Sequence, residues 1–143
     1  MKVLFICYAN VGRSQVAEAC FKTLSQHDSH SAGIAVNERI AQMKLPGKKL
    51  KHAAIQRSVE YIKREFGIDI GEKERQQLVP EMMNTADLAI VIAEKERWPG
   101  YLKESDKVVF WDIPDPARMA DGAADEVYKE VRRRVEQLVA KIG

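Results

Sequence analysis

Residues 7–14 read CYANVGRS, and they directly follow the apolar run KVLFI at residues 2–6. The next residues, QVAEACFKTL at 15–24, carry apolar side chains at helical spacing. A strand that ends on a cysteine is thus followed by a tight turn and then by a helix that begins near Arg13. This succession of strand, turn and helix indicates both the type of fold and the position of the reactive residues.

Short apolar segments alternate with amphipathic ones along the rest of the chain. The strand candidates are residues 2–6, 30–34, 87–93 and 107–113, of which 30–34 is the weakest. The other three are nearly continuous runs of Val, Ile, Leu and Phe, which is typical of strands covered on both faces. Helical stripes run from Val16 to Leu24, from Ile55 to Phe66 and from Val127 to Ile142, and Gly67 is a predicted helix cap.

This alternation predicts an α/β fold: an open, flavodoxin-like sheet of about four parallel strands with helices on both faces. We expect a single domain over residues 1–143, because no repeat, low-complexity segment or linker interrupts the chain. Ligands of such sheets bind at the carboxyl ends of the strands. Cys7 and the segment IPDP at 113–116 both follow strand ends, so we expect them at the same edge.

The composition is that of an ordinary globular protein, with 45% hydrophobic and 31% charged residues. A net charge of +2 is too small to indicate binding to nucleic acid. The apolar stretch LAIVIA at 88–93 is far shorter than the ~20 residues of a membrane helix, and the N-terminus lacks a signal-peptide cleavage site. Cys7 and Cys20 form no disulfide framework, so we expect a cytoplasmic protein without membrane attachment.

The turn at residues 8–12 predicts an anion site, since backbone N–H groups that precede a helix N-terminus converge on the same space. Asn10 tolerates left-handed backbone, and Gly12 lets the backbone approach a ligand closely. Arg13 adds a planar guanidinium that matches two phosphate oxygens, and Ser14 places a hydroxyl near the sulfur. The predicted substrate-binding residues are Tyr8, Ala9, Asn10, Val11, Gly12 and Ser14.

Cys7 in this setting meets a helix dipole, N–H donors and a guanidinium, all of which stabilise a thiolate. We therefore expect Cys7 to be ionised near neutral pH and to attack the oxyanion that the loop holds. The alternative is a buried core cysteine beside a surface arginine. Cys20 lies on the apolar stripe of its helix and is interpreted as a core residue.

Transfer of a phosphoryl group to Cys7 leaves an oxygen that needs a proton, which indicates a carboxylic acid at the same edge. Asp115 fits this role, because Pro114 and Pro116 fix the backbone on both sides of it. Asp112 is the alternative acid, although it is better placed to end the strand or cap a turn. Asp115 could also be a plain turn residue.

The motifs CYANVGRS and IPDP together resemble the low-molecular-weight protein tyrosine phosphatases and the arsenate reductases of the same fold. SAG (31–33), GIDI (67–70), QQL (76–78) and ADLAIVIA (86–93) resemble further landmarks of this family, so the likeness covers nearly the whole chain. The resemblance implies that Cys7 is the nucleophile, Arg13 the phosphate ligand and Asp115 the general acid.

The same resemblance implies supporting roles for three polar residues. Ser14 would steady the thiolate, and Asn10 would hold the loop with help from Ser31. Neither a metal nor another cofactor is implied. Because His27 and His30 lie apart from any other ligand cluster, they are interpreted as polar loop residues.

The chain departs from the family pattern at several positions. Gly12 stands where many members carry a second cysteine that protects the first by a disulfide. Ala117 stands where the phosphatases commonly place a tyrosine that stacks on the substrate ring. Lys73 stands where many members have a histidine. The segment of residues 36–51 looks longer and more basic than usual, and its lysines at 44–51 are interpreted as part of a solvated loop.

The sequence thus predicts a metal-independent phosphomonoester hydrolase that acts on phosphotyrosine or another aryl phosphate through a phosphocysteine. Val11, where tyrosine-directed relatives often have Ile, favours an aromatic substrate. Trp98 and Trp111 are interpreted as core residues, whereas Tyr8 fits a pocket wall and a packed position equally well. The expected partners are a phosphorylated protein or a small aryl phosphate, and neither nucleic acid nor a membrane.

Three alternatives stay open. An arsenate reductase of this fold would need an external thiol, because no cysteine follows Cys20 and an internal disulfide cascade is excluded. A cysteine phosphocarrier would store the phosphoryl group, although it has no use for an acid such as Asp115. A binding module would hold anions without any chemistry.

Overall fold

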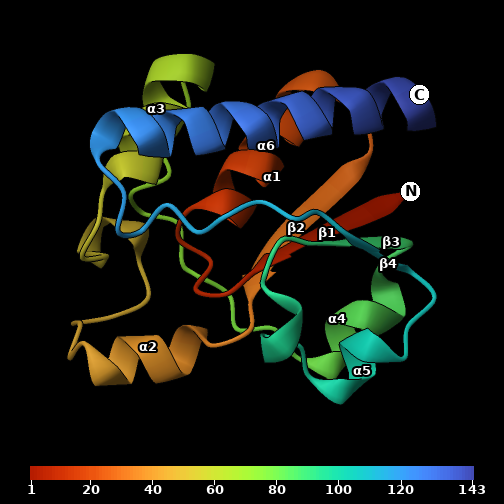
Figure 1. Cartoon of the computed structure of the whole chain (residues 1–143), viewed down its shortest axis with the longest axis horizontal. Helices are drawn as coiled ribbons and strands as arrows, with labels where there is room; N and C mark the ends of the chain where they lie inside the picture. Colours follow the sequence, from red (N-terminus) through yellow and green to blue (C-terminus); the bar gives the residue numbers. More distant parts are fainter.

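The computed structural model describes residues 1–143. Its centre is a parallel sheet of strand order β2-β1-β3-β4, with helices on both faces (Figure 1). The strands are β1 (Lys2–Cys7), β2 (Asp28–Gly33), β3 (Leu88–Val91) and β4 (Val108–Phe110). The predicted fold class is therefore confirmed. β1 lies between β2 and β3, which places Cys7 at the carboxyl edge of the sheet.

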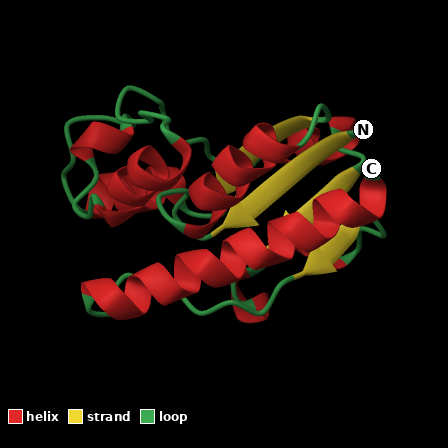
Figure 2. Cartoon of the chain, turned by 90° about the horizontal axis from the view of Figure 1, so that it is seen from above, coloured by secondary structure: helices red, strands yellow, loops and turns green.

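Helices of different length cover the two faces of the sheet. They are α1 (Arg13–Leu24), α2 (Val36–Gln42), α3 (Arg57–Phe66), α4 (Pro80–Thr85), α5 (Gly100–Lys103) and α6 (Asp121–Ile142), with single 3-10 turns η1 (Leu50–His52) and η2 (Lys95–Arg97). α1, α3 and α6 pack on one face, and α4 and α5 on the other (Figure 1). Seen from above, α6 runs along the sheet to the end where both termini lie (Figure 2).

β1 is buried on both of its faces because its apolar residues alternate between two clusters. Val3, Phe5 and Cys7 belong to the cluster under α1, α3 and α6. Leu4 and Ile6 belong to the cluster under α4 and α5. Coverage on both sides explains why residues 3–7, VLFIC, are continuously apolar.

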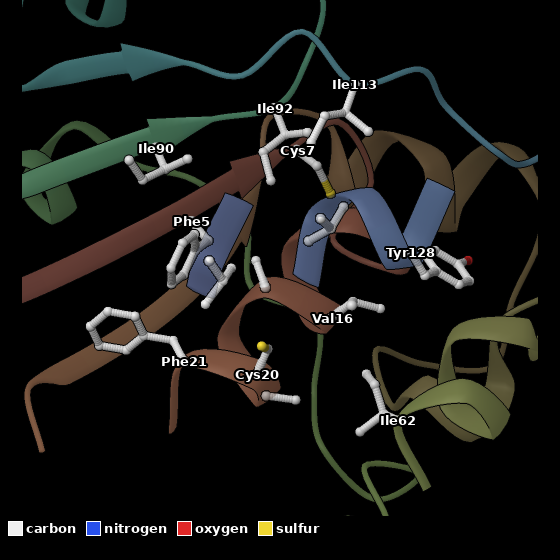
Figure 3. Packing of buried hydrophobic residues seen from close by; sticks show 14 of the residues in the cluster. Phe5, Cys7, Val16, Cys20, Phe21, Ile62, Ile90, Ile92, Ile113 and Tyr128 are labelled. Carbon is white, nitrogen blue, oxygen red and sulfur yellow. The ribbon is translucent and has the colours of Figure 1, made fainter. Parts of the chain in front are cut away.

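Aromatic side chains pack against one another within the larger cluster. Phe5 meets the edge of Phe21 (Figure 3), with ring centroids 5.6 Å apart. The ring centroid of Trp111 lies 6.2 Å from that of Phe5. Full burial of one such side chain contributes about 1.5–3 kcal/mol. Trp98 donates from Nε1 to the Ala93 carbonyl at 2.9 Å and packs against the smaller cluster. Both tryptophans are packed as predicted.

The periodic patterns predicted the existence of the three long helices correctly, but not the exact residues at which each helix begins and ends. α3 begins at Arg57, two residues after Ile55, which is 36% exposed, and Leu24 at the end of α1 is 47% exposed. β2 begins at Asp28, two residues earlier than expected. No stripe predicted α2, since Val36 is its one buried residue.

The basic segment after α2 is tied to the body of the protein. Lys49 and Lys51 both pair with Glu72, at 2.7 and 2.6 Å. These two lysines are therefore partly neutralised. Elsewhere, none of the helices combines the length and the apolar character that crossing a membrane requires.

Candidate active site

The loop of residues 8–12 joins Cys7 at the end of β1 to Arg13 at the start of α1. Asn10 has a φ of 55°, in the left-handed region that asparagine tolerates. No carbonyl or side-chain oxygen of the protein accepts from the backbone N–H groups of residues 8–15. A run of free N–H donors at a helix N-terminus is the arrangement that binds anions.

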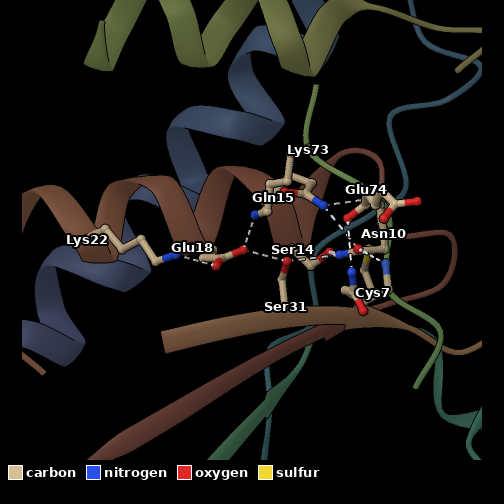
Figure 4. A network of polar contacts seen from close by, with 10 residues as sticks. Cys7, Asn10, Ser14, Gln15, Glu18, Lys22, Ser31, Lys73 and Glu74 are labelled. Atoms are coloured by element: carbon tan, nitrogen blue, oxygen red, sulfur yellow. Dashed lines mark hydrogen bonds and ion pairs between the residues drawn. The ribbon is translucent and has the colours of Figure 1, made fainter. Parts of the chain in front are cut away.

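Cys7 lies against a hydroxyl at the base of this loop. Its Sγ is 2.9 Å from Ser14 Oγ (Figure 4). Ser14 Oγ already accepts a hydrogen bond from Asn10 Nδ2 at 2.8 Å, so its own proton is free to point at the sulfur. Donation to the sulfur stabilises a thiolate.

Asn10 braces the loop with its whole amide group. Besides Ser14, its Nδ2 donates to Ser31 Oγ on β2 at 3.1 Å. Its Oδ1 accepts from the Gln76 backbone N–H at 2.8 Å and from Gln15 Nε2 at 3.0 Å. Asn10 is fully buried, and these contacts satisfy the amide and fix the left-handed turn.

A carboxylate stands behind this brace, on the side away from Cys7. Glu18 Oε1 accepts from Ser31 Oγ at 2.6 Å and contacts Lys73 Nζ, and its Oε2 pairs with Lys22 Nζ at 2.8 Å (Figure 4). Burial acts to raise the pKa of Glu18, but Lys73, Lys22 and Ser31 outweigh it and hold this pKa below its ordinary value. Lys73, which stands where relatives often have a histidine, thus forms an ion pair with Glu18. Glu18 itself was not predicted from the sequence.

Arg13 is held at the carboxyl edge of the sheet by one of its nitrogens. Nη1 donates to the carbonyls of Ile92 and Ile113, at 2.8 and 2.9 Å, and contacts Glu94 Oε1 at 3.2 Å. Nη2 lies 3.9 Å from Asp115 Oδ2, and Nε makes no hydrogen bond to the protein. The guanidinium is therefore anchored by Nη1 while Nε and Nη2 are available to an anion.

Asp115 lies on the loop after β4, with half of its side chain exposed. Its Oδ1 accepts from the Ala117 backbone N–H at 3.0 Å. Arg57 of α3 fixes the same loop by donating to the carbonyls of Pro116 and Ala117, at 3.0 and 2.9 Å, and to that of Met119. Asp115 lines the same cavity as Cys7, whereas Asp112 does not.

This cavity has a volume of about 690 Å³. Cys7, Arg13 and Asp115 all line it, as do the loop residues Tyr8, Ala9, Val11 and Gly12. Asn10 and Ser14 stay behind the loop as buried supports. One wall is apolar and is formed by Met43, Leu45, Ala53, Ala54 and Ile55.

Two tyrosines supply the aromatic surface of the cavity. The guanidinium of Arg97 lies 4.0 Å from the centre of the Tyr8 ring, so Tyr8 is a wall residue. Tyr128 of α6 (Figure 3) also lines the cavity, and burial raises its pKa to about 12. A Cβ atom at Gly12 would lie 3.2 Å from Tyr128 Oη, so the absent side chain at residue 12 leaves room for this ring.

Another cavity, of about 550 Å³, lies beyond the Glu18 network and touches neither Cys7 nor Arg13. No group of three or more His, Cys, Asp or Glu side chains is arranged to hold a metal ion. The chemistry-bearing residues therefore gather at the larger cavity.

The sequence model of the low molecular weight phosphotyrosine protein phosphatase family matches residues 2–143. The chain belongs to this family. The family and the phosphatase class predicted from the sequence are thereby confirmed.

Two curated relatives of this phosphatase bear different names. One is an arsenate reductase of Halalkalibacterium halodurans, 27% identical over 98% of this chain and 91% of the relative. The other is the probable low molecular weight protein-tyrosine-phosphatase EpsP of Ralstonia nicotianae, 29% identical over 98% of this chain and 94% of the relative. Sequence identity alone therefore does not separate the two activities.

Solved structures resemble the phosphatase over its whole length. Vibrio vulnificus Wzb in complex with benzylphosphonate has a TM-score of 0.78 and 25% identity, covering 99% of this chain and 98% of that one. The low molecular weight protein tyrosine phosphatase from T. tengcongensis has a TM-score of 0.74 and 26% identity, covering 99% of both chains.

The sequence analysis missed several arginines at the site. Arg75 is 3% exposed and donates from Nε and Nη2 to the Ala9 carbonyl, at 3.1 and 3.0 Å. Arg57 holds the loop of Asp115, and Arg97 lies over the ring of Tyr8. Each arginine stands in a polar stretch such as KERQQL, where nothing distinguishes a buried guanidinium from a solvated one.

Proposed function

We propose that this phosphatase hydrolyses aryl phosphates, phosphotyrosine among them, through a phosphocysteine formed on Cys7. The proposal rests chiefly on the sulfur of Cys7, which lies 2.9 Å from the Ser14 hydroxyl and directly before the free N–H groups of residues 8–15. A nucleophile at the base of an anion-binding loop is suited to attack on phosphorus.

The reaction takes two displacements. The Cys7 thiolate attacks phosphorus in line, the bond to the ester oxygen breaks, and Asp115 gives its proton to the leaving oxygen. Asp115 then takes a proton from a water molecule that attacks the phosphocysteine. The P–S bond breaks, the thiolate returns, and inorganic phosphate leaves.

The loop and Arg13 stabilise the charge that develops on the equatorial oxygens in both steps. Because Nη1 of Arg13 is fixed by two backbone carbonyls, its Nε and Nη2 keep their direction without substrate. Such prior orientation lowers the cost of reorganisation in the transition state.

The aromatic preference rests on Tyr8 and Tyr128, which flank the cavity where Ala117 provides no ring. A flat ring between such side chains gains contact area and offset stacking. Benzylphosphonate, bound by the Vibrio vulnificus relative, joins a phenyl ring to a phosphonate and is consistent with this preference. The natural substrate would then be a phosphorylated protein or a small aryl phosphate.

The decisive test is turnover of p-nitrophenyl phosphate and phosphotyrosine by wild type and Cys7→Ser. We expect wild type to hydrolyse both without added metal and with no inhibition by EDTA. Cys7→Ser should lose kcat by about 10⁴-fold or more. Cys20→Ala, which removes a core thiol, is the matched control and should retain kcat. Full activity of Cys7→Ser would refute the mechanism.

Acid quenching of the wild-type reaction separates a phosphatase from a phosphocarrier. A phosphatase yields a transient phosphoenzyme, absent in Cys7→Ser, together with continuous release of phosphate. One equivalent of stable phosphoenzyme without further release would identify a carrier.

A second candidate function is arsenate reduction, because one relative carries that name at 27% identity. Burial raises the pKa of Cys20 to about 11, so Cys20 is a poor partner for disulfide exchange with Cys7. The reaction would then depend on a soluble thiol. The cytoplasm, which we propose as the compartment of this protein, supplies such thiols. Arsenite formation with glutathione at a rate exceeding p-nitrophenyl phosphate hydrolysis would favour this candidate.

A further inference from the structure

The cavity above the loop carries a concentrated positive charge. Asp115 is the one acidic residue that lines it. Six arginines line it as well: Arg13, Arg39, Arg57, Arg75, Arg97 and Arg118. The chain as a whole is nearly balanced, with 23 Lys and Arg against 21 Asp and Glu. The excess at the cavity is therefore local.

Two of these arginines already have a role in the proposed mechanism. Arg13 faces the transferred phosphoryl group, and Arg57 holds the backbone of the Asp115 loop. The remaining four exceed what one phosphate monoester needs.

Arg75 and Arg39 lie close enough for their charges to interact. Burial lowers the pKa of Arg75, the negative charge of Cys7 raises it, and the positive charge of Arg39 lowers it again. Arg39 contacts only Gln42 and Met43, with no carboxylate within ion-pair distance. Two neighbouring guanidinium groups, of which Arg39 has no ion-pair partner, attract an anion.

Arg97 and Arg118 extend this positive surface along the cavity. Arg97 lies over Tyr8 and is paired with Glu94 at 3.7 Å, a carboxylate that it shares with Arg13. Arg118 lies on the Asp115 loop, lines the cavity, and its side chain makes no hydrogen bond or ion pair. The volume of 690 Å³ falls within the range of about 300–1,000 Å³ of pockets that enclose a whole small ligand. The cavity thus has room beyond a phosphate group.

We propose that Arg39, Arg75, Arg97 and Arg118 form a second anion subsite, which selects phosphotyrosine with acidic side chains beside it. The proposal rests on the aryl phosphatase function proposed above and names its substrate class. The transferred phosphate occupies the loop while a neighbouring carboxylate contacts Arg39, Arg97 and Arg118, and the buried Arg75 contributes its positive charge. A substrate with cationic neighbours is repelled by the same charges.

The test compares kcat/KM for three phosphotyrosine peptides of equal length. One has Asp and Glu on both sides of the phosphotyrosine, one has the isosteric Asn and Gln, and one has Ala. At low ionic strength we expect the acidic peptide to exceed the isosteric one about tenfold, with a difference that shrinks as salt is added. Equal values for the three peptides would overturn the subsite.

Single variants locate the effect. Arg39→Gln and Arg118→Gln should each lower the ratio of acidic to isosteric kcat/KM about threefold. Arg133→Gln on α6 is the matched control, because Arg133 is exposed and changes the net charge equally. It should leave both rate constants unchanged. A ratio that falls equally in all three variants would mean that overall charge, not the subsite, is responsible.

Binding to Cys7→Ser separates this proposal from the proposed function. Fluorescence polarisation with the same peptides measures Kd when no turnover occurs. Tighter binding of the acidic peptide that is weakened by Arg39→Gln supports the subsite even if hydrolysis fails in wild type. Equal binding of the acidic and isosteric peptides overturns the subsite even if hydrolysis succeeds.

Discussion

Among single residues, Asn10 best shows how one side chain converts a strained turn into a fixed loop. It occupies left-handed backbone, and its amide contacts Ser14, Ser31, Gln15 and Gln76. The sequence predicted the backbone preference, because asparagine is among the few residues that tolerate it. It implied Ser31 as a support, but the contacts with Gln15 and Gln76 depend on the tertiary fold.

Asp115→Asn tests the assignment of the general acid. The amide cannot donate the proton that the leaving oxygen needs, so we expect kcat for phosphotyrosine to fall about 10²- to 10⁴-fold. The loss should be smaller for p-nitrophenyl phosphate, whose leaving group needs less protonation. Steady-state kinetics with both substrates measures the difference.

Asp112→Asn is the matched control for this experiment. Asp112 does not line the cavity and should retain wild-type kcat on both substrates. If Asp112→Asn shows the leaving-group dependence and Asp115→Asn does not, the acid has been assigned to the wrong residue.

The candidate site was predictable from the sequence where its residues stand next to strand ends. Cys7 directly ends one apolar run, and Asp115 follows another, so a parallel sheet had to bring them to one edge. Arg75 has no such marker. Its contact with the Ala9 carbonyl arises only when segments more than sixty residues apart meet.

Among the structural elements, the end of β2 has the closest contact with the loop. A Cβ atom at Gly33 would lie 2.7 Å from the Asn10 nitrogen and 2.8 Å from the Tyr8 carbonyl oxygen. The backbone of Ala35 also donates to that Tyr8 carbonyl at 2.9 Å. Close approach between β2 and the loop therefore requires glycine at residue 33.

Gly33→Ala is expected to displace the loop. The added methyl group meets backbone atoms that cannot move independently, so stability should fall by about 1–3 kcal/mol. Displacement of the phosphate site by a fraction of an ångström should lower kcat/KM about 10²-fold. Urea denaturation and p-nitrophenyl phosphate kinetics measure the two effects.

Gly122→Ala on α6 is the control, because a Cβ atom there meets nothing within 4 Å. It should keep full activity and gain slightly in stability, since alanine favours helix. Wild-type kcat/KM in Gly33→Ala would show that the loop does not depend on close packing against β2.

The elements divide into those that the sequence predicted and those it could not. The three long helices and strands β1, β2 and β3 have several buried positions each, whereas β4 has none and was predicted from its apolar residues alone. α2 and α4 each bury a single residue, Val36 and Met83, so their short segments carry no periodic signal. Their helical form depends on the surrounding structure.

For the molecule as a whole, the Glu18 network links the stability of the fold to the geometry of the loop. Glu18→Gln removes the negative charge that Lys73 and Lys22 surround. We expect a loss of about 3 kcal/mol at pH 7, at the lower end for a buried pair because Lys73 is 33% exposed. Urea denaturation at pH 7 measures this loss.

The same variant should change the response to acid. The pKa of Glu18 in the folded protein lies below its ordinary value of 4.5, so its contribution is complete above pH 4.5 and is lost as pH falls through the folded-state pKa. Wild type should therefore lose more stability below pH 4.5 than Glu18→Gln does. Glu60→Gln, an exposed carboxylate on α3, is the control and should follow wild type. Parallel pH profiles of wild type and Glu18→Gln would contradict this prediction.

The charge of the cavity is a property that only the complete fold reveals. Arg39, Arg75, Arg97 and Arg118 come from separate segments, and each resembles an ordinary solvated charge in the sequence. The near neutrality of the chain further conceals their concentration. The composition of the chain gives its average charge, whereas the distribution of charge over the surface depends on which segments meet in the fold.

The glycine at position 12 also determines how the enzyme responds to peroxide. Peroxide converts a reactive thiolate to a sulfenic acid, which is repaired when another thiol condenses with it. The loop offers no such thiol, because Gly12 gives its space to Tyr128, and Cys20 is buried in the core. Recovery of the oxidised enzyme must therefore depend on glutathione or a similar small reductant, so its activity would follow the redox state of its surroundings.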